Sequence, residues 1–469
     1  MGNTKIQAAR AAEYLLVVAC STLSILHSKS NKGSKAPPNV SPNAVDAVVR
    51  VMQSNPKSSR LQASGCGALG TFAANNEQRY RIMKIPRGTD VIKVAILEHE
   101  EDVTVLEQAF LALYNLCALA NDATAEDINV VIDIVLGLMR SYPYSDKLQE
   151  EACRTLWMFV TTTDIHKNEK HMDAISAAGG IDTVTNTMRE HTRVKTIQEG
   201  CVSILYSFCE ASSQELQRAL VTQNMISSII GAMKHNSNVN MQEKAMSILV
   251  ALLKVSESNY SIQMIVLAEG SVQSILHAMS SYPKSARLLK DALTVLLHVG
   301  IDQENEEHFH ESGGVKVIAD ILCTHGDDVD LKKDACSVLS YLAMSLSKKC
   351  FLQADVLKNI AGALYAHPQH KELNECGLHT IWNVLIKDAK RNRALAGRAN
   401  IIDVVVSAMH NHIESENIQE RSCGILWSLS SERENLETLN RTGAVKGVIN
   451  AILSHVFSLS VQEQGIGAL

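Results

Sequence analysis

One segment returns along the whole chain and limits what the chain can fold into. It has the form Gln-Glu-x-Ala-x-x-x-Leu-Trp and is plainest from Gln149 to Trp157 and from Gln419 to Trp427. Its leucine position recurs every 42 to 49 residues, at Leu69, Leu113, Leu156, Leu205, Leu249, Leu296, Leu339, Ile381, Leu426 and Leu469. This period is typical of stacked helical repeats, so we predict an all-α chain of about ten repeats.

Each repeat also contains two breaks. A glycine precedes an apolar helical run, as at Gly180, Gly270, Gly314 and Gly443. A turn position, often followed by proline, lies seven residues before the Gln position, at Asn55, His99, Tyr142, His191, His235, Tyr282, His325, His367, His412 and His455. Glycine interrupts helices, and the residue before a proline leaves the helical region. Each repeat should therefore fold as a short helix, a second helix, a turn and a long third helix.

The order of these parts resembles the armadillo repeat. The third helix, with its Leu-Gln-Glu-x-Ala-Cys-x-x-Leu-Trp pattern, is the most specific part. It is similar to the slightly long form in armadillo-repeat-containing scaffold proteins and in the armadillo regions of some leucine-rich-repeat kinases. The resemblance covers the chain from about residue 43. It implies a right-handed α-solenoid of armadillo/HEAT-like repeats that binds proteins.

Three parts are expected along the chain. Residues 1–28 should form a capping helix or a degenerate half-repeat, residues 29–42 a flexible linker, and residues 43–469 the solenoid. Leu469 falls in the middle of the last long helix, and no polar capping repeat follows it. Because solenoids normally need such caps, we expect the solenoid to be truncated within its last repeat.

Composition narrows the partners and the location. A formal net charge of −6 provides no basic field for phosphates, so nucleic acid is not an expected partner. The eleven cysteines are scattered without a CxxC pair, which indicates a reducing location, the cytoplasm or also the nucleus. The apolar stretch at 14–26 is too short to span a bilayer, so no membrane insertion is expected, although a signal peptide has a similar pattern.

Some motifs resemble those of cofactor, metal or catalytic sites but are explained by the structure of the repeats. Gly65 to Gly70 spells GxGxxG, but the motif lies inside a predicted third helix instead of following a strand. The histidines of the turn position occur once per repeat, too far apart to share a metal ion, and would lie at the C-terminal ends of helices. Cysteines also recur at one helix position. We therefore expect no enzyme activity, catalytic residue, metal site, cofactor or small-molecule substrate.

The residue after the repeated leucine should point away from the core, and by the resemblance it lines the concave groove. This groove position holds Gly70, Tyr114, Trp157, Tyr206, Val250, Leu297, Ser340, Trp382 and Trp427, and so includes all three tryptophans. Large aromatic side chains dominate binding hot spots. The predicted partner-binding groove is Tyr114, Trp157, Thr161, Tyr206, Trp382 and Trp427. The alternative is that these rings only pack against the neighbouring repeat.

A carboxylate precedes the groove position by seven residues in most repeats. These residues are Glu107, Glu150, Glu199, Glu243, Glu375, Glu420 and Glu463, with Lys290 and Lys333 in two other repeats. The first six form a predicted acidic groove margin that would favour basic peptides. The alternative is that a carboxylate in the first turn stabilises its own helix through the helix dipole.

These features favour a non-enzymatic scaffold or adaptor that holds an extended or helical segment of another protein. A regulatory armadillo region of a larger enzyme, such as a protein kinase, is one alternative. A nuclear-import-type adaptor is another. The resemblance to importin-α is poor, because its groove uses an Asn four residues after each Trp, and here those positions are Thr161, Ile386 and Ser431.

Overall fold

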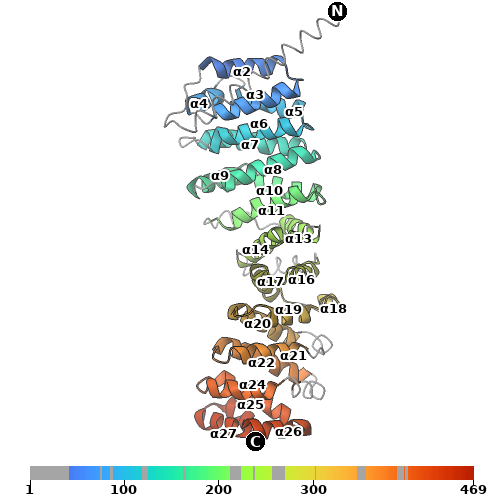
Figure 1. Ribbon diagram of the computed structural model, residues 1–469, viewed down its shortest axis with the longest axis vertical. Helices are drawn as coiled ribbons and strands as arrows, with labels where there is room; N and C mark the ends of the chain where they lie inside the picture. The colour runs from blue at the N-terminus through green and yellow to red at the C-terminus, as the bar shows by residue number, and fades with distance from the viewer. Residues whose placement is uncertain are drawn as a thin grey trace, which may run out of the picture. The chain divides into compact units, whose positions relative to one another are not determined.

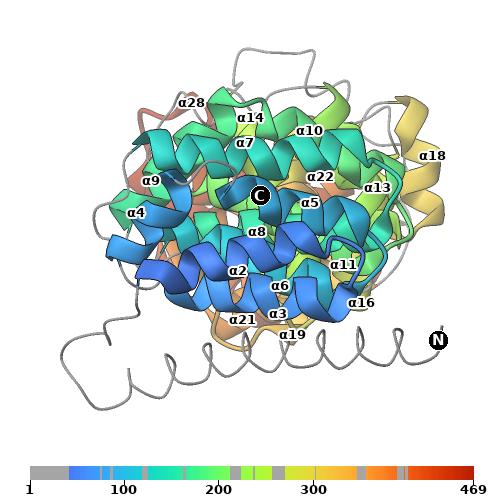
Figure 2. The ribbon, with the colours of Figure 1, turned by 90° about the horizontal axis from the view of Figure 1, so that it is seen from above.

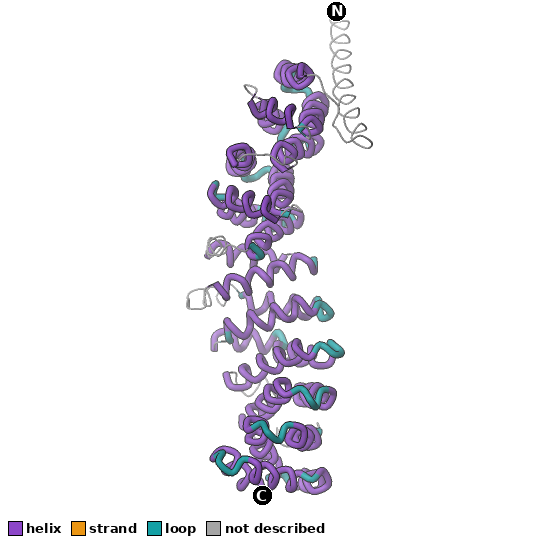
Figure 3. The backbone as a smooth tube through the Cα atoms, turned by 90° about the vertical axis from the view of Figure 1, so that its left-hand side faces the viewer, coloured by secondary structure: helices purple, strands orange, loops and turns teal. Residues whose placement is uncertain are grey.

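The chain is seen in a computed structural model, which describes residues 42–73, 76–84, 88–118, 125–161, 165–211, 223–235, 238–255, 270–301, 303–345, 355–387, 396 and 400–469. In these ranges every regular element is a helix, and short loops join the helices (Figure 3). The all-α prediction is therefore confirmed. The predicted capping helix at 1–28 and the linker up to residue 41 lie outside the described residues.

The chain divides into two compact units, at residues 1–237 and 238–469. The described helices of the N-terminal unit are α2 (Pro42–Ser54), α3 (Ser59–Phe72), α4 (Asn76–Lys84), α5 (Gly88–Glu98), α6 (Val103–Ala118), α7 (Ala125–Ser141), α8 (Asp146–Val160), α9 (Ile165–Ala177), α10 (Gly180–Glu190), α11 (Lys195–Cys209) and α13 (Gln223–His235). α2 lies beside α3 and α5, as the view from above shows (Figure 2). The third helices α3, α6, α8 and α11 pack on one another in chain order.

The C-terminal unit repeats this arrangement. Its described helices are α14 (Val239–Val255), α16 (Ser271–Ser281), α17 (Ala286–Val299), α18 (Gln303–Glu311), α19 (Gly314–Thr324), α20 (Val329–Ser345), α21 (Asp355–Ala366), α22 (Lys371–Lys387), α24 (Ile401–Asn411), α25 (Glu416–Ser430), α26 (Leu436–Thr442), α27 (Ala444–Ser454) and α28 (Leu459–Ala468), with a short 3-10 helix at Arg433–Asn435. The third helices α14, α17, α20, α22, α25 and α28 pack in sequence (Figure 1). The second helices α16, α19, α21, α24 and α27 form a parallel series of contacts.

The repeated leucine position forms the core, as predicted. From Leu69 to Leu426 the residues at this position are at most 2% exposed. The exception is Leu469, at 64%. The spacing of 42 to 49 residues between the leucines therefore reflects one buried layer per repeat, with each layer covered by the next.

The predicted break before the second helix is also present. A residue with positive φ lies there in five repeats, at Gly179, Gly270, Gly313, Asn400 and Gly443. In two repeats this is one residue earlier than predicted, because Gly180 and Gly314 already begin their helices. Gly180 must still be small, since a Cβ there would lie 2.6 Å from the Ile175 carbonyl oxygen.

The recurring glutamine caps the second helix of its own repeat. Gln149 is fully buried, and its Nε2 donates to the carbonyl oxygens of Met139, at 2.8 Å, and Tyr142, at 3.0 Å. The same pair of bonds is made by Gln62, Gln198, Gln419 and Gln462. Carbonyl groups at the end of a helix have no partner within the helix, and the glutamine amide supplies one.

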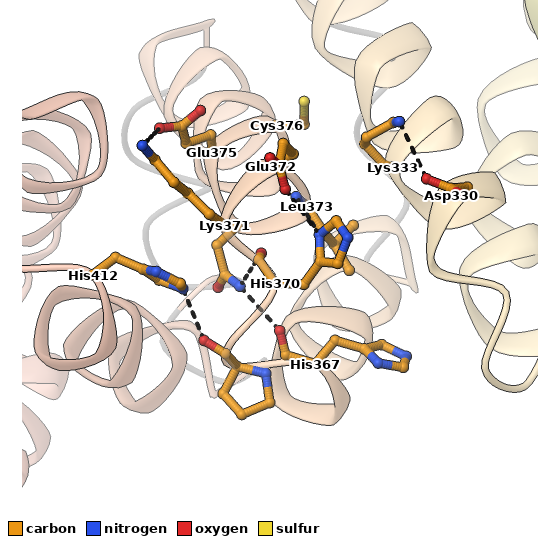
Figure 4. Close-up of polar contacts among 12 residues, drawn as sticks. Asp330, Lys333, His367, His370, Lys371, Glu372, Leu373, Glu375, Cys376 and His412 are labelled. Carbon is orange, nitrogen blue, oxygen red and sulfur yellow. Dashed lines mark hydrogen bonds and ion pairs between the residues drawn. The ribbon is translucent and has the colours of Figure 1, made fainter. Parts of the chain in front are cut away.

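The turn histidines connect successive repeats. His412 donates from Nε2 to the carbonyl oxygen of Pro368, in the turn of the preceding repeat, at 2.9 Å (Figure 4). Equivalent bonds, which we call turn ties, come from His99, His191, His325 and His455. The predicted place at a helix end is correct. The principal interaction is nevertheless with the neighbouring repeat, and the helix dipole alone does not account for it.

Candidate functional site

A groove opens between the third helices α22, α25 and α28 of the C-terminal unit. Its volume is ≈ 430 Å³. It is lined by Trp382, Leu385, Ile386, Gly424, Ile425, Trp427, Ser428, Ser431 and Gln464. The structure thus brings two of the predicted groove residues, Trp382 and Trp427, into one site.

Each tryptophan of this groove lies over a glycine of the next third helix. A Cβ on Gly424 would fall within the ring of Trp382, and one on Gly467 would come within 2.6 Å of the Trp427 ring. The two rings therefore pack on the neighbouring repeat and also line the groove. Trp427 keeps 44% of its surface exposed, so it presents a large apolar face to solvent.

The positions one helical turn after the tryptophans extend the apolar lining. Ile386 is 64% exposed and lines the groove together with Ser431. Sequence reasoning used these positions only to look for asparagine. The missed signal was the spacing of four residues between Trp382 and Ile386, which places both side chains on the same face of α22.

The predicted aromatic residues of the N-terminal unit have different surroundings. The ring of Tyr114 packs against Phe159, with centroids 5.4 Å apart, and burial raises the pKa of the Tyr114 phenol. Tyr206 is half-buried. Trp157 is 40% exposed, and the exposed Thr161 donates its hydroxyl to the Trp157 carbonyl at 2.7 Å. Trp157 and Thr161 are therefore the best-exposed predicted site residues of this unit.

The groove position does not face solvent in every repeat. Gly70, Val250 and Ser340 are buried, whereas Leu297 is 45% exposed. At Gly70 the reason is a close helix approach, because a Cβ there would lie 3.1 Å from the Cα of Ala112 in the next third helix. The expectation that this position lines a groove is therefore wrong for the small residues.

The predicted acidic margin is half-buried, and two of its members contact the next repeat. Glu107, Glu150, Glu199, Glu243, Glu375 and Glu420 all have intermediate exposure. Glu243 accepts a hydrogen bond from the Ser285 hydroxyl at 2.6 Å, and Glu375 accepts one from Ser415 at 2.8 Å. Lys371 lies 3.9 Å from Glu375 on the same helix (Figure 4). These carboxylates connect repeats, a role that the helix-dipole explanation did not include.

A buried carboxyl group adjoins this margin in the third repeat. Glu151 is 7% exposed, and its Oε2 lies 3.4 Å from Nε of Arg154. Burial raises the pKa of the Glu151 carboxyl, Arg154 lowers it, and the charges of Glu107 and Glu150 raise it further. Burial is the largest of these causes, so folding shifts the carboxyl toward its neutral form relative to the unfolded chain.

The GxGxxG motif and the recurring cysteines, which resemble parts of cofactor or catalytic sites, lie in packed helices. Gly65 and Gly67 lie within α3, and a Cβ on Gly65 would meet the Met52 sulfur at 2.5 Å. Burial raises the pKa of the Cys66 and Cys423 thiols to about 12, which keeps them protonated. Among the described residues, no three His, Cys, Asp or Glu side chains are placed to hold a metal ion. None of the described helices is both long and apolar enough to cross a membrane.

Known structures resemble this arrangement. The chain is similar to a structure from work on a phosphorylation switch that controls the interaction between cadherin and beta-catenin, with 14% identity, a TM-score of 0.51, and coverage of 96% of this chain and 95% of that one. The fold is an armadillo-repeat solenoid. Two engineered proteins are 16% and 18% identical over 54% and 55% of this chain and 98% and 96% of their own, with TM-scores of 0.40 and 0.38. No family model and no curated protein sequence matches the chain.

Proposed function

We propose that this armadillo solenoid is a protein-binding scaffold and that it holds a segment of another protein in the groove of α22, α25 and α28. The observation that carries the proposal is the joint exposure of Trp427 and Ile386 in one groove that Trp382 also lines. Large apolar side chains gathered in a concave site contribute most to binding energy in protein interfaces.

The groove is better suited to an amphipathic helix than to an extended peptide. An extended segment has unpaired backbone N–H and C=O groups that need partners once water is excluded. The positions that would offer side-chain amides hold Ile386 and Ser431 instead. A helix satisfies its own backbone and can lay an apolar stripe against the two tryptophans. The absence of asparagine four residues after each tryptophan is the reason that we do not propose a nuclear-import adaptor.

Apolar contact, more than charge, should determine affinity. On α22, Glu375 is half-buried and already bonded to Ser415, so it is poorly placed to attract a basic peptide. Binding through this groove should therefore change little between low and moderate salt. A regulatory region of a larger enzyme would bind its partner in the same groove. Substitutions in the groove therefore test binding both for a separate scaffold and for such a region.

The test is affinity purification of cellular proteins on the wild-type chain and on Ile386→Glu, followed by mass spectrometry. Ile386 is 64% exposed, so a charge there should leave the fold intact while disrupting the apolar groove. Tyr365→Glu is the matched control, because Tyr365 is 78% exposed on α21, outside the groove. We expect bound proteins to be lost with Ile386→Glu alone. If Ile386→Glu retains the same proteins as the wild type, the groove is not the binding site.

A further inference from the structure

One cationic side chain beside the groove has no partner in the part of the chain that the structure describes. Arg421 lies on α25 and is half-buried. Its Nε is buried and makes no hydrogen bond. Its guanidinium forms no ion pair within the described chain, although Glu420 directly precedes it. A cation that has lost part of its water and has no acceptor is unfavourable, so an acceptor from another molecule would be favoured there.

The position of Arg421 on α25 places it on the helix face that lines the groove. Gly424 and Ser428 line the groove and follow Arg421 by three and seven residues, which are spacings of one helix face. On α22, which packs against α25, His379 precedes Trp382 by three residues in the same way. Arg421 and His379 therefore continue the groove from the tryptophans toward the starts of the two helices.

His379 places an uncharged ring near this cation. Burial lowers the pKa of the His379 imidazole, and the charge of Arg421 lowers it further. The Nδ1 atom of His379 lies 3.0 Å from the hydroxyl oxygen of Ser340 on α20, and Asn383 donates its amide to the same oxygen at 3.4 Å. An anion bound at Arg421 would offset the Arg421 charge, so the pKa of His379 would rise when the site is occupied.

We propose that Arg421 selects partner helices that carry a carboxylate beside their apolar residues. The inference rests on the proposed function, because the same helix must lay its apolar face in the groove. Guanidinium groups bind carboxylates through two parallel hydrogen bonds, which add specificity as well as energy. Residues three or four apart share a helix face, so the Asp or Glu should lie one or two turns from the residues that contact Trp382 and Ile386. One half-buried pair of this kind is only weakly screened by salt.

The test is selection on the full chain from a displayed library of helical peptides that keep an apolar stripe and are randomised elsewhere. Peptides selected on the wild type should carry Asp or Glu at one fixed distance from the stripe. Arg421→Glu should select Lys or Arg at that position, and Arg421→Gln, which removes the charge, should select neither. Arg441→Glu is the matched control, because the Arg441 side chain is 71% exposed on α26, outside the groove. It should select the same peptides as the wild type.

The affinity of one selected peptide measures the contact directly. Replacing its Asp or Glu by the corresponding amide should weaken binding to the wild type roughly tenfold and leave binding to Arg421→Gln unchanged. Equal weakening for both chains would show that the carboxylate contacts another residue. Binding of the acidic peptide should also raise the pKa of His379, measured by nuclear magnetic resonance, and the amide peptide should not.

Ile386→Glu separates this inference from the proposed function. Selected peptides that lose binding to Ile386→Glu but show no preference for an acidic position would overturn the role of Arg421 and leave the groove as the binding site. Peptides that bind Ile386→Glu as well as they bind the wild type would refute the groove itself, and the inference with it.

Discussion

At the scale of single residues, Gln149 shows how one side chain connects two repeats. It is fully buried, its amide donates to two carbonyls at the end of α7, and its Oε1 accepts the Thr187 hydroxyl of α10 at 3.0 Å. The recurring glutamine of the sequence therefore joins helices of its own repeat, and Gln149 also reaches the next one. It satisfies backbone groups that the turn leaves unpaired.

Replacing Gln149 by Ala should destabilise the third repeat by roughly 2–4 kcal/mol, because buried polar groups lose their partners. Hydrogen exchange of the α7 and α8 amides measures this local free energy. Gln462→Ala is the control, since Gln462 makes the same two carbonyl bonds but is half-buried and accessible to water. Gln462→Ala should lower the local free energy of unfolding less than Gln149→Ala does. Equal losses would contradict the role assigned to burial.

The buried carboxyl of Glu151 gives a pH prediction with a definite sign. Its pKa is raised above the ordinary value of 4.5, so at pH values between 4.5 and the folded pKa the folded chain holds a proton that the unfolded chain has released. Stability contributed by this group is therefore present at pH below 4.5 and is lost as pH rises through the folded pKa.

Glu151→Gln should remove this loss. At pH above the folded pKa of Glu151 the variant should be more stable than the wild type. At low pH the free energies of unfolding of the two chains should converge. The substitution also weakens the contact with Arg154. Because the Arg154 side chain is half-exposed, this contact contributes little to stability. Urea unfolding at several pH values, with the exposed Glu434→Gln as control, measures the difference. A wild type that is the more stable of the two at neutral pH would refute the assignment.

At the scale of helices, the groove depends on glycines as much as on tryptophans. Gly424 lets the ring of Trp382 approach α25 closely, and Gly467 does the same for Trp427 on α28. A third helix with any side chain at these positions would push the ring out and reshape the groove.

Gly424→Ala should displace Trp382, change its fluorescence, weaken partner binding in the groove and cost about 1–3 kcal/mol through overpacking. Gly362→Ala on α21 is the control, because a Cβ there meets nothing within 4 Å. It should be neutral or stabilise the helix by roughly 0.5–1 kcal/mol. Unchanged tryptophan fluorescence in Gly424→Ala would show that the ring is not held as described.

At the scale of the whole molecule, each repeat contacts mainly its neighbours, so damage should stay local. His412→Ala removes the turn tie to Pro368 and should speed hydrogen exchange in α21 to α25 by weakening one hydrogen bond, about 0.5–1.5 kcal/mol. The N-terminal unit should be unaffected. His410→Ala is the matched control, because His410 is exposed in the last turn of α24, two residues before His412. Faster exchange throughout the chain would instead indicate one cooperative unit.

The sequence predicted the features that recur and missed those that depend on a particular neighbour. The leucine spacing identified the buried layer, and the tryptophans identified the C-terminal groove. The burial of Gly70 could not be predicted, because it depends on how closely Ala112 of the next repeat approaches. The pairing of Tyr114 with Phe159 likewise joins two different repeats. The turn ties were present in the sequence as histidines at the turn position, but their acceptors are backbone atoms, which have no residue signature.

The turn ties have a mechanical consequence. They join the turns of several pairs of successive repeats, as at His191 and Pro143 or His412 and Pro368. These hydrogen bonds hold the turns of the joined repeats together at one edge. When joined repeats move apart, the far ends of their third helices should separate while the joined turns keep their spacing. These repeats should therefore bend about a preferred axis.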